Sequence, residues 1–184
     1  MESKEQFIVL FNVIKRNGKD RLLEYIESTD FFTAPASTRF HGSYEGGLVE
    51  HSLNVFNRMK KHQQYPLETL AIVSLLHDLC KADFYTIDYR NVKQPNGTWT
   101  KAPYYAINDR QPIGNHGDKS AFIAQRFIAL SEEELAAIRY HMGAFQEGDL
   151  KNISNVFEKY PLALLLHIAD MEATYLDEKR DANA

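Results

Sequence analysis

The stretch Leu75-Leu76-His77-Asp78-Leu79-Cys80-Lys81 places an imidazole and a carboxylate side by side at the end of an otherwise apolar segment. Residues 67–76 before this pair have few polar positions, and they predict a buried helix that opens at Pro66. His77 and Asp78 should therefore lie near the interior. A buried carboxylate must be paired with a cation or bound to a metal, so we expect partners for Asp78 elsewhere in the chain.

Length and composition are those of an ordinary globular protein. The chain has 184 residues, of which 44% are hydrophobic, 25% charged and 12% aromatic. We therefore expect one domain spanning residues 1–184. A net charge of -4 and a pI near 6.0 argue against a protein that coats extended nucleic acid, but they leave room for a small anionic substrate.

The sequence favours a cytoplasmic protein. Its single cysteine, Cys80, cannot form an intramolecular disulfide, and the first residues lack the basic start and apolar run of a signal peptide. No apolar run approaches the roughly 18 to 20 residues that span a bilayer, so we expect no membrane partner. The oligomeric state is not legible from the sequence.

Helical periodicity continues on both sides of the opening stretch. The group Ser131-Glu132-Glu133-Glu134 has the pattern of a capping box, which starts a helix. The predicted helices cover residues 7–15, 20–27, 48–62, 66 to the His-Asp pair, a segment after 116–120 that ends near residue 130, 131–141, and 161–178. The tail, residues 179–184, is predicted to fray.

A different pattern occupies residues 84–107, where extended runs rich in β-branched and aromatic residues flank Gln94-Pro95-Asn96-Gly97. This arrangement predicts a β-hairpin. A lone hairpin is marginally stable in water, so we expect it to lean on the helices as a flap. Both a substrate lid and an insertion without a role in binding are open interpretations.

Several inward-facing or helix-end residues carry the atom types that bind metals. The spacing between successive candidates is about that of one antiparallel helical step with its connection, so the ends of neighbouring helices could meet at one centre. The candidates are His51, His77, Asp78, His116, His141 and Asp170. Such a set, with one carboxylate able to bridge, is sufficient for two metal ions.

In this order and helical setting, the candidates resemble the pattern of the histidine-aspartate (HD) superfamily of metal-dependent phosphohydrolases. The short family motif His-Asp-x-Gly-Lys occurs here with Cys80 in place of the usual glycine. The resemblance implies an all-α, HD-domain-like helical bundle with the β-hairpin as an insertion. It also implies that His51, His77, Asp78 and Asp170 surround one metal, while Asp78 bridges to a second held by His116 and His141.

The resemblance implies an enzyme that cleaves a phosphomonoester or phosphodiester bond of a nucleotide or small phosphate ester. A hydroxide bridging two divalent ions would attack phosphorus, and mixed imidazole and carboxylate ligands suit Mn, Fe, Co, Ni or Zn. Asp78 and Lys81 are the expected catalytic residues, and Lys81 is the first candidate for a phosphate contact. Arg39, His41 and Lys119 are further candidates for binding the substrate, with ordinary solvated roles as the alternative.

Two other functions are compatible with the same residues. A few HD proteins hold two irons with this ligand set and cleave carbon bonds with dioxygen, which makes a di-iron oxygenase one alternative. The other is a catalytically silent regulatory module that binds a metal or a nucleotide. Metal content and substrate turnover discriminate among the three.

Overall fold

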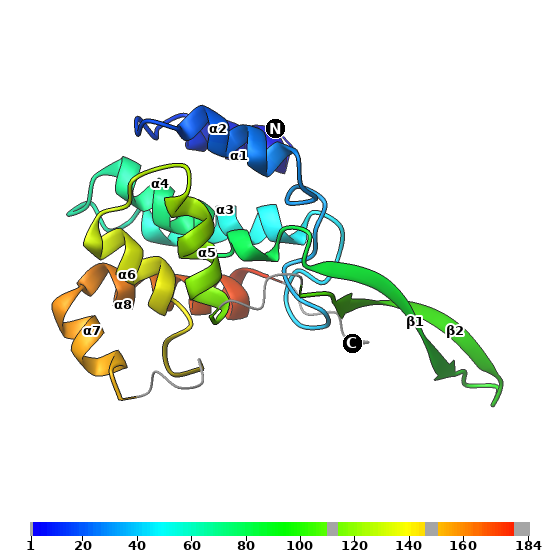
Figure 1. The fold of residues 1–184 in the computed structure, drawn as a ribbon. Coiled ribbons are helices and arrows are strands. Elements are labelled where there is room, and N and C mark those ends of the chain that lie inside the picture. The colour runs from blue at the N-terminus through cyan, green and yellow to red at the C-terminus, as the bar shows by residue number, and fades with distance from the viewer. Residues whose placement is uncertain (1, 110–113, 146–150, 179–184) are drawn as a thin grey trace.

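The computed structural model describes residues 2–109, 114–145 and 151–178. These residues form a mostly helical bundle with one antiparallel β-hairpin (Figure 1). The helices are α1 Ser3–Phe11, α2 Lys19–Glu27, α3 Gly47–Met59, α4 Leu67–Leu76, α5 His116–Gln125, α6 Glu132–Tyr140, α7 Ile153–Lys159 and α8 Pro161–Glu172. The strands are β1 Tyr85–Lys93 and β2 Trp99–Ile107, and three short helical turns are η1 Leu79–Lys81, η2 Gly143–Phe145 and η3 Ala173–Asp177.

Helix α4 lies in the centre of the hydrophobic core. Every residue from Leu70 to Leu76 is buried, as expected from the nearly unbroken apolar run. Helix α3 packs against α4 and α8, while α6 packs against α5 and α8. In Figure 1, α3 and α4 lie between the pair α1 and α2 on one side and the pair α6 and α8 on the other. Burial on all sides explains why α4 is apolar around its whole circumference.

Two predicted helix starts are confirmed by their caps. Pro66 is the N-cap residue of α4, and Ser131 forms the predicted capping box with Glu134 at the start of α6. Glu134 is itself buried, and both of its carboxylate oxygens accept hydrogen bonds from Arg16. Because Arg16 precedes α2, this ion pair joins the first part of the chain to α6.

Other helix boundaries differ from the prediction. Helix α1 covers Ser3–Phe11, earlier than residues 7–15, because a capping box between Glu2 and Glu5 starts it near the first residues. The last α-helix, α8, ends at Glu172 and is followed by the π-helical turn η3. The prediction was a regular helix to residue 178. Helix α7 was not predicted, and none of its residues is buried. The tail, residues 179–184, lies outside the described residues.

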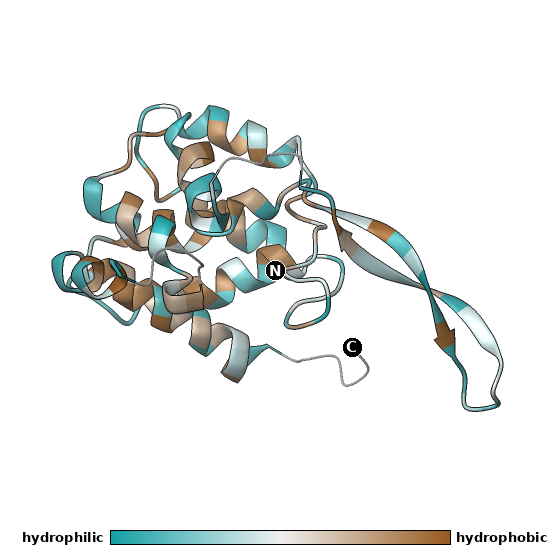
Figure 2. Cartoon of the chain, turned by 60° about the horizontal axis from the view of Figure 1, so that its bottom comes forward, coloured by the Kyte–Doolittle hydropathy of each residue, from teal (hydrophilic) through white to brown (hydrophobic). Residues whose placement is uncertain are grey.

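The predicted hairpin is confirmed, but its expected placement as a flap on the helices is wrong. The register pairs Tyr85 with Ile107 and Lys93 with Trp99, and the ribbon projects away from the bundle (Figures 1 and 2). Ile87, Tyr89, Trp99 and Ile107 are 62% to 64% exposed. The apolar residues on one face are cross-strand neighbours, so they partly cover one another without a helix beneath them.

None of the described helices is long and apolar enough to cross a membrane.

Removing the projecting part of the hairpin should leave the bundle stable. We expect replacement of residues 86–106 by a short Gly-Ser turn to change the melting temperature by less than about 3 °C, because exposed segments contribute little to stability. Circular dichroism melts would measure this change. Leu75→Ala, which empties a fully buried position, should cost about 2–5 kcal/mol and serves as the positive control. A loss on excision as large as that of Leu75→Ala would contradict the prediction.

Candidate metal centre

The structure brings all six predicted ligands together from five different parts of the helical bundle. They lie in three overlapping groups, and within each group one ligand atom per residue lies within 4.8 Å of the others. The groups are His51, His77 and Asp78; His77, His141 and Asp170; and Asp78, His116 and His141. His77 and Asp78 follow the end of α4, and His141 follows the end of α6. The first residue of α5 is His116.

A close approach of two helix ends places His116 beside His141. A Cβ atom at Gly117 would lie 2.1 Å from the carbonyl oxygen of Arg139 and 2.9 Å from that of Ile138. Only glycine therefore allows the first turn of α5 to pack this closely on the last turn of α6.

Each of the four histidines is held through Nδ1, which leaves Nε2 to face the cluster. In His77 and His141, Nδ1 donates to the carbonyl oxygens of Ser74 and Ile138, at 2.8 and 2.7 Å. These carbonyl groups belong to the last turns of α4 and α6. Carbonyl groups in the last turn of a helix have no N–H partner within that helix and can therefore accept a hydrogen bond from a side chain. A carbonyl oxygen can only accept, so Nδ1 carries the proton and Nε2 is free to bind a metal.

The other two rings are held by side chains. Nδ1 of His51 lies 2.8 Å from Oε1 of Glu178, and Nδ1 of His116 lies 2.9 Å from the sulfur of Cys80. Cys80 stands where the family motif usually has glycine, and its thiol is thus a contact of a candidate ligand. The residue occupies a short 3-10 turn, η1, and is buried.

Asp78 lies at the centre of the cluster with its two oxygens in different surroundings. Oδ1 lies 2.5 Å from Nε2 of His116 and 3.6 Å from Nε2 of His141. Oδ2 lies 2.7 Å from Nζ of Lys81 and 3.6 Å from Nε2 of His51. The side chain is only 2% exposed. A carboxylate with one oxygen toward each half of the cluster has the geometry of a bridging ligand.

The surroundings of Asp78, His77 and His141 shift their pKa values, so that the carboxylate is charged and the two imidazoles are neutral. Burial alone would raise the pKa of Asp78, but Lys81, His77 and His116 together lower it well below its usual value. Burial lowers the pKa of His141 to about 3 and also lowers that of His77. Both imidazoles are therefore neutral at pH 7, which is the form that binds metals.

Two other histidines in the cluster carry charge. Burial would lower the pKa of His51, but its contacts with Asp170 and Glu178 raise it to about 10. Burial also opposes charge on His116, whereas Cys80 and Asp78 raise its pKa to about 9. The positive charges of these two protonated rings compensate the negative charges of the buried carboxylates. A metal ion that binds to the rings would displace the protons on their Nε2 atoms.

An unpaired nitrogen shows that the cluster suits a cation. Among the described residues, Nε2 of His141 is buried and has no hydrogen-bond partner, although it lies close to Asp78 and His116. Leaving such an atom unpaired costs free energy unless a ligand completes it. Imidazole nitrogens with carboxylate oxygens form a donor set for the first-row transition metals. The residues present therefore fit a metal site.

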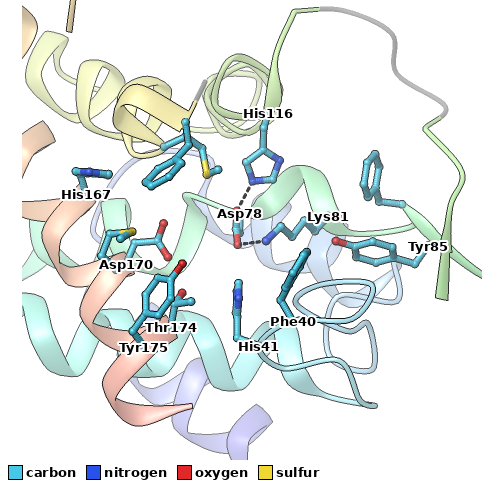
Figure 3. A pocket seen from close by; sticks show the side chains of 14 residues that line it. Phe40, His41, Asp78, Lys81, Tyr85, His116, His167, Asp170, Thr174 and Tyr175 are labelled. Atoms are coloured by element: carbon cyan, nitrogen blue, oxygen red, sulfur yellow. Dashed lines mark hydrogen bonds and ion pairs between the residues drawn. The ribbon is translucent and has the colours of Figure 1, made fainter. Parts of the chain in front are cut away.

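A cavity of about 410 Å³ opens beside the cluster (Figure 3). Asp78, Lys81, His116 and Asp170 contribute polar atoms to it. Aromatic and methionine side chains form most of the remaining wall. They are Phe40, Phe84, Tyr85, Met142, Phe145, Met171 and Tyr175. The cavity thus combines one cationic and acidic end with an apolar, ring-lined interior.

The three further residues predicted to bind substrate have different positions. His41 lines the cavity, and its ring centroid lies 4.9 Å from that of His51. The exposed guanidinium of Arg39 packs on Phe40, 5.1 Å from the ring centroid. Lys119 forms an ion pair with Asp109. Among the described residues, neither Arg39 nor Lys119 belongs to the cavity wall, so their role in binding stays a prediction.

Sequence reasoning missed Glu178 and most of the cavity wall. Of the aromatic residues described in the predicted hairpin, residues 84–107, Phe84 and Tyr85 at its base line the cavity, where Lys81 is also found. Phe145 and Tyr175 come from segments with no motif, and their contribution depends on how helix ends meet. Glu178 follows Asp170 within the same C-terminal segment. The sequence therefore offered one signal for Glu178, namely a carboxylate a short distance after a predicted metal ligand.

Comparison with known proteins identifies the class. The HD domain family matches residues 48–174, which is more than half of the chain. The chain therefore belongs to the HD domain family, whose members are typically metal-dependent phosphohydrolases. No match was found among curated proteins or among solved structures. The buried clusters of histidine and aspartate are consistent with the metal site of this family.

Metal binding should stabilise the folded protein, because the cluster exists only in that state. After dialysis against EDTA, addition of Mn²⁺ or Zn²⁺ at about 100 times its dissociation constant should add about 2.7 kcal/mol of stability. Thermal melts with and without metal would measure the increase. Asp78→Asn should abolish the metal-dependent shift, whereas Asp88→Asn on the hairpin should retain it. An unchanged melting temperature in the native protein would refute this assignment.

Proposed function

We propose that this protein is a metal-dependent phosphohydrolase that cleaves a phosphomonoester or phosphodiester bond of a nucleotide or another small phosphate ester. One observation carries the proposal. The cavity reaches Asp78 and Lys81 at the place where the histidine Nε2 atoms converge. A phosphate group bound there would contact the cation of Lys81 beside the metal ligands.

The ligands divide between two proposed ions. His51, His77, Asp78 and Asp170 would hold one ion, and Asp78, His116 and His141 would hold the second. When bound, divalent Mn, Fe, Co, Ni or Zn ions supply Lewis acidity for the phosphoryl group and lower the pKa of water. Two of the ligand groups agree with this division, namely His51, His77 and Asp78 for the first ion and Asp78, His116 and His141 for the second. The third group joins His141 to His77 and Asp170 and so connects the two proposed sites.

Lys81 is the residue proposed to bind the phosphate. Its ammonium group lies 2.7 Å from Oδ2 of Asp78 and its side chain is 14% exposed, so the charge is held in place at the cavity wall. Burial would lower the pKa of Lys81, but Asp78 raises it above its usual value, and the side chain is therefore cationic. A preorganised cation stabilises negative charge that develops on phosphate oxygens in the transition state.

The rest of the cavity suits the organic part of a small substrate. A volume of about 410 Å³ lies toward the lower end of the range for small-molecule sites. Phe40 and Tyr175 offer ring faces on which a base could stack (Figure 3). His41 also lines the cavity, with its ring centroid 4.9 Å from that of the candidate ligand His51, and is proposed to donate a hydrogen bond to the substrate. These features favour a mononucleotide-sized phosphate ester over a long polymer.

Elemental analysis combined with a hydrolysis screen tests the proposal. Purified protein would be assayed against nucleotides and a generic phosphodiester with each metal, beside Asp78→Ala and His77→Ala. We expect about two equivalents of metal, and hydrolysis that both variants abolish. One equivalent with hydrolysis would assign His116 and His141 to the substrate. Two irons with oxygen consumption would favour the oxygenase, and bound metal without turnover would favour a regulatory module.

Removal of the Lys81 cation should slow catalysis without removing the metals. Lys81→Met keeps most of the side-chain volume, and we expect kcat to fall about 100- to 1,000-fold, the effect typical of losing one group that stabilises transition-state charge. Steady-state kinetics and metal content would both be measured. Lys60→Met, on an exposed lysine that contacts Asn57, is the control. An unchanged kcat in Lys81→Met would assign Lys81 to structure alone.

A further inference from the structure

Glu178 is a buried carboxylate that lies beyond the part of the chain matched by the HD domain family, residues 48–174. Its side chain is 1% exposed. Oε1 lies 2.8 Å from Nδ1 of His51 and accepts a hydrogen bond from Nδ2 of Asn54 at 3.2 Å. The residue therefore contacts a candidate metal ligand from the side opposite the cluster.

A single residue of α3 holds the turn that delivers Glu178. Nη1 of Arg58 donates to Glu172 at 3.2 Å, at the end of α8. Its Nε and Nη2 donate to the two oxygens of Asp177 at 2.8 and 2.5 Å, at the end of η3. Both ends of the π-helical turn are thus tied to α3. Single π-helical turns are frequent at functional sites.

The residues of α3 that take part are spaced for one face of the helix. His51, Asn54 and Arg58 follow one another at intervals of three and four, which places them along the same side. Arg58 fastens the turn, Asn54 holds the carboxylate, and His51 receives it. One helix therefore carries both the ligand and the groups that position its partner.

Stability alone does not account for a carboxylate in this position. Oε2 of Glu178 is buried and has no hydrogen-bond partner among the described residues. Burying a charge with an unpaired oxygen is unfavourable, and a well-packed apolar side chain is often more stable there. The hydrogen bond to Nδ1 of His51 is the contact that explains a carboxylate at this position. Histidines that bind metals usually donate their other ring N–H to such a carboxylate.

We infer that Glu178 is the positioning residue of His51: it accepts the Nδ1 proton, fixes the ring, and directs Nε2 toward Asp170 and Asp78. Nε2 lies 3.2 Å from Oδ1 of Asp170 and 3.6 Å from Oδ2 of Asp78. A carboxylate on Nδ1 also makes Nε2 a stronger donor to a metal ion. This inference rests on the proposed function only in taking His51 as a metal ligand.

The test compares metal affinity among variants of the full chain. We expect Glu178→Ala to weaken binding of Zn²⁺ about 10- to 100-fold, as measured by competition with a chromophoric chelator. Glu178→Gln retains an oxygen acceptor and should recover part of the loss. In the Zn²⁺-loaded protein, the downfield proton resonance of His51 Nδ1–H should disappear in Glu178→Ala. Neither readout depends on activity.

Two further variants separate positioning from folding. Glu134→Gln alters another buried carboxylate, one that pairs with Arg16 outside the cluster; it should lower the melting temperature and leave the Zn²⁺ affinity unchanged. Arg58→Met releases the turn without touching the cluster, and it should weaken Zn²⁺ binding less than Glu178→Ala does. Should Glu178→Ala fail to fold, Glu178→Gln and Arg58→Met still decide the question.

The result for His51→Ala distinguishes the inference from the function on which it rests. Loss of affinity in His51→Ala together with unchanged affinity in Glu178→Ala and Arg58→Met would overturn the role of Glu178 and leave the phosphohydrolase proposal intact. Unchanged affinity in His51→Ala as well would overturn both the role of Glu178 and the assignment of His51 as a ligand.

Discussion

The buried charge of Asp78 is the constraint on which the site depends. A carboxylate that is 2% exposed is unfavourable unless cationic groups surround it, and here the cations come from three separate segments, with Lys81, His116 and His51. Lys81 and His116 contact it directly, while His51 and His141 lie slightly farther away. Lys81, His116 and His141 stand at or next to a helix end, whereas His51 lies within α3. The helices must therefore converge in one arrangement for Asp78 to be tolerated.

Helix ends do two things in this structure. They bring side chains to one centre, and their unpaired carbonyl groups orient the rings that arrive there. His77 and His141 each donate Nδ1–H to the carbonyl oxygen three residues before them. The same hydrogen bond satisfies a carbonyl group in the last turn of the helix and fixes the orientation of the ring. A separate orienting side chain is needed only for His51, within α3, and His116, at the start of α5. Glu178 and Cys80 occupy those places.

Much of the fold was predictable because local patterns determine it. The apolar run of α4, the capping box at Ser131 and the turn residues at Gln94 to Gly97 each specify an element through their own chemistry. The six candidate ligands could also be identified, since histidine and aspartate at the ends of apolar helices are conspicuous. Helix α7 was missed because it buries no residue and so lacks an amphipathic signal.

The sequence by itself determined the helical class, the hairpin and the identity of the residues that cluster, because these depend on short-range periodicity and residue chemistry. Only the tertiary structure decided that the hairpin projects from the bundle, that Cys80 contacts His116, and that Glu178 reaches His51 across the turn held by Arg58. It also decided which aromatic residues surround the cavity. These features arise from contacts between segments far apart in the chain, and no local pattern encodes the distance between such segments.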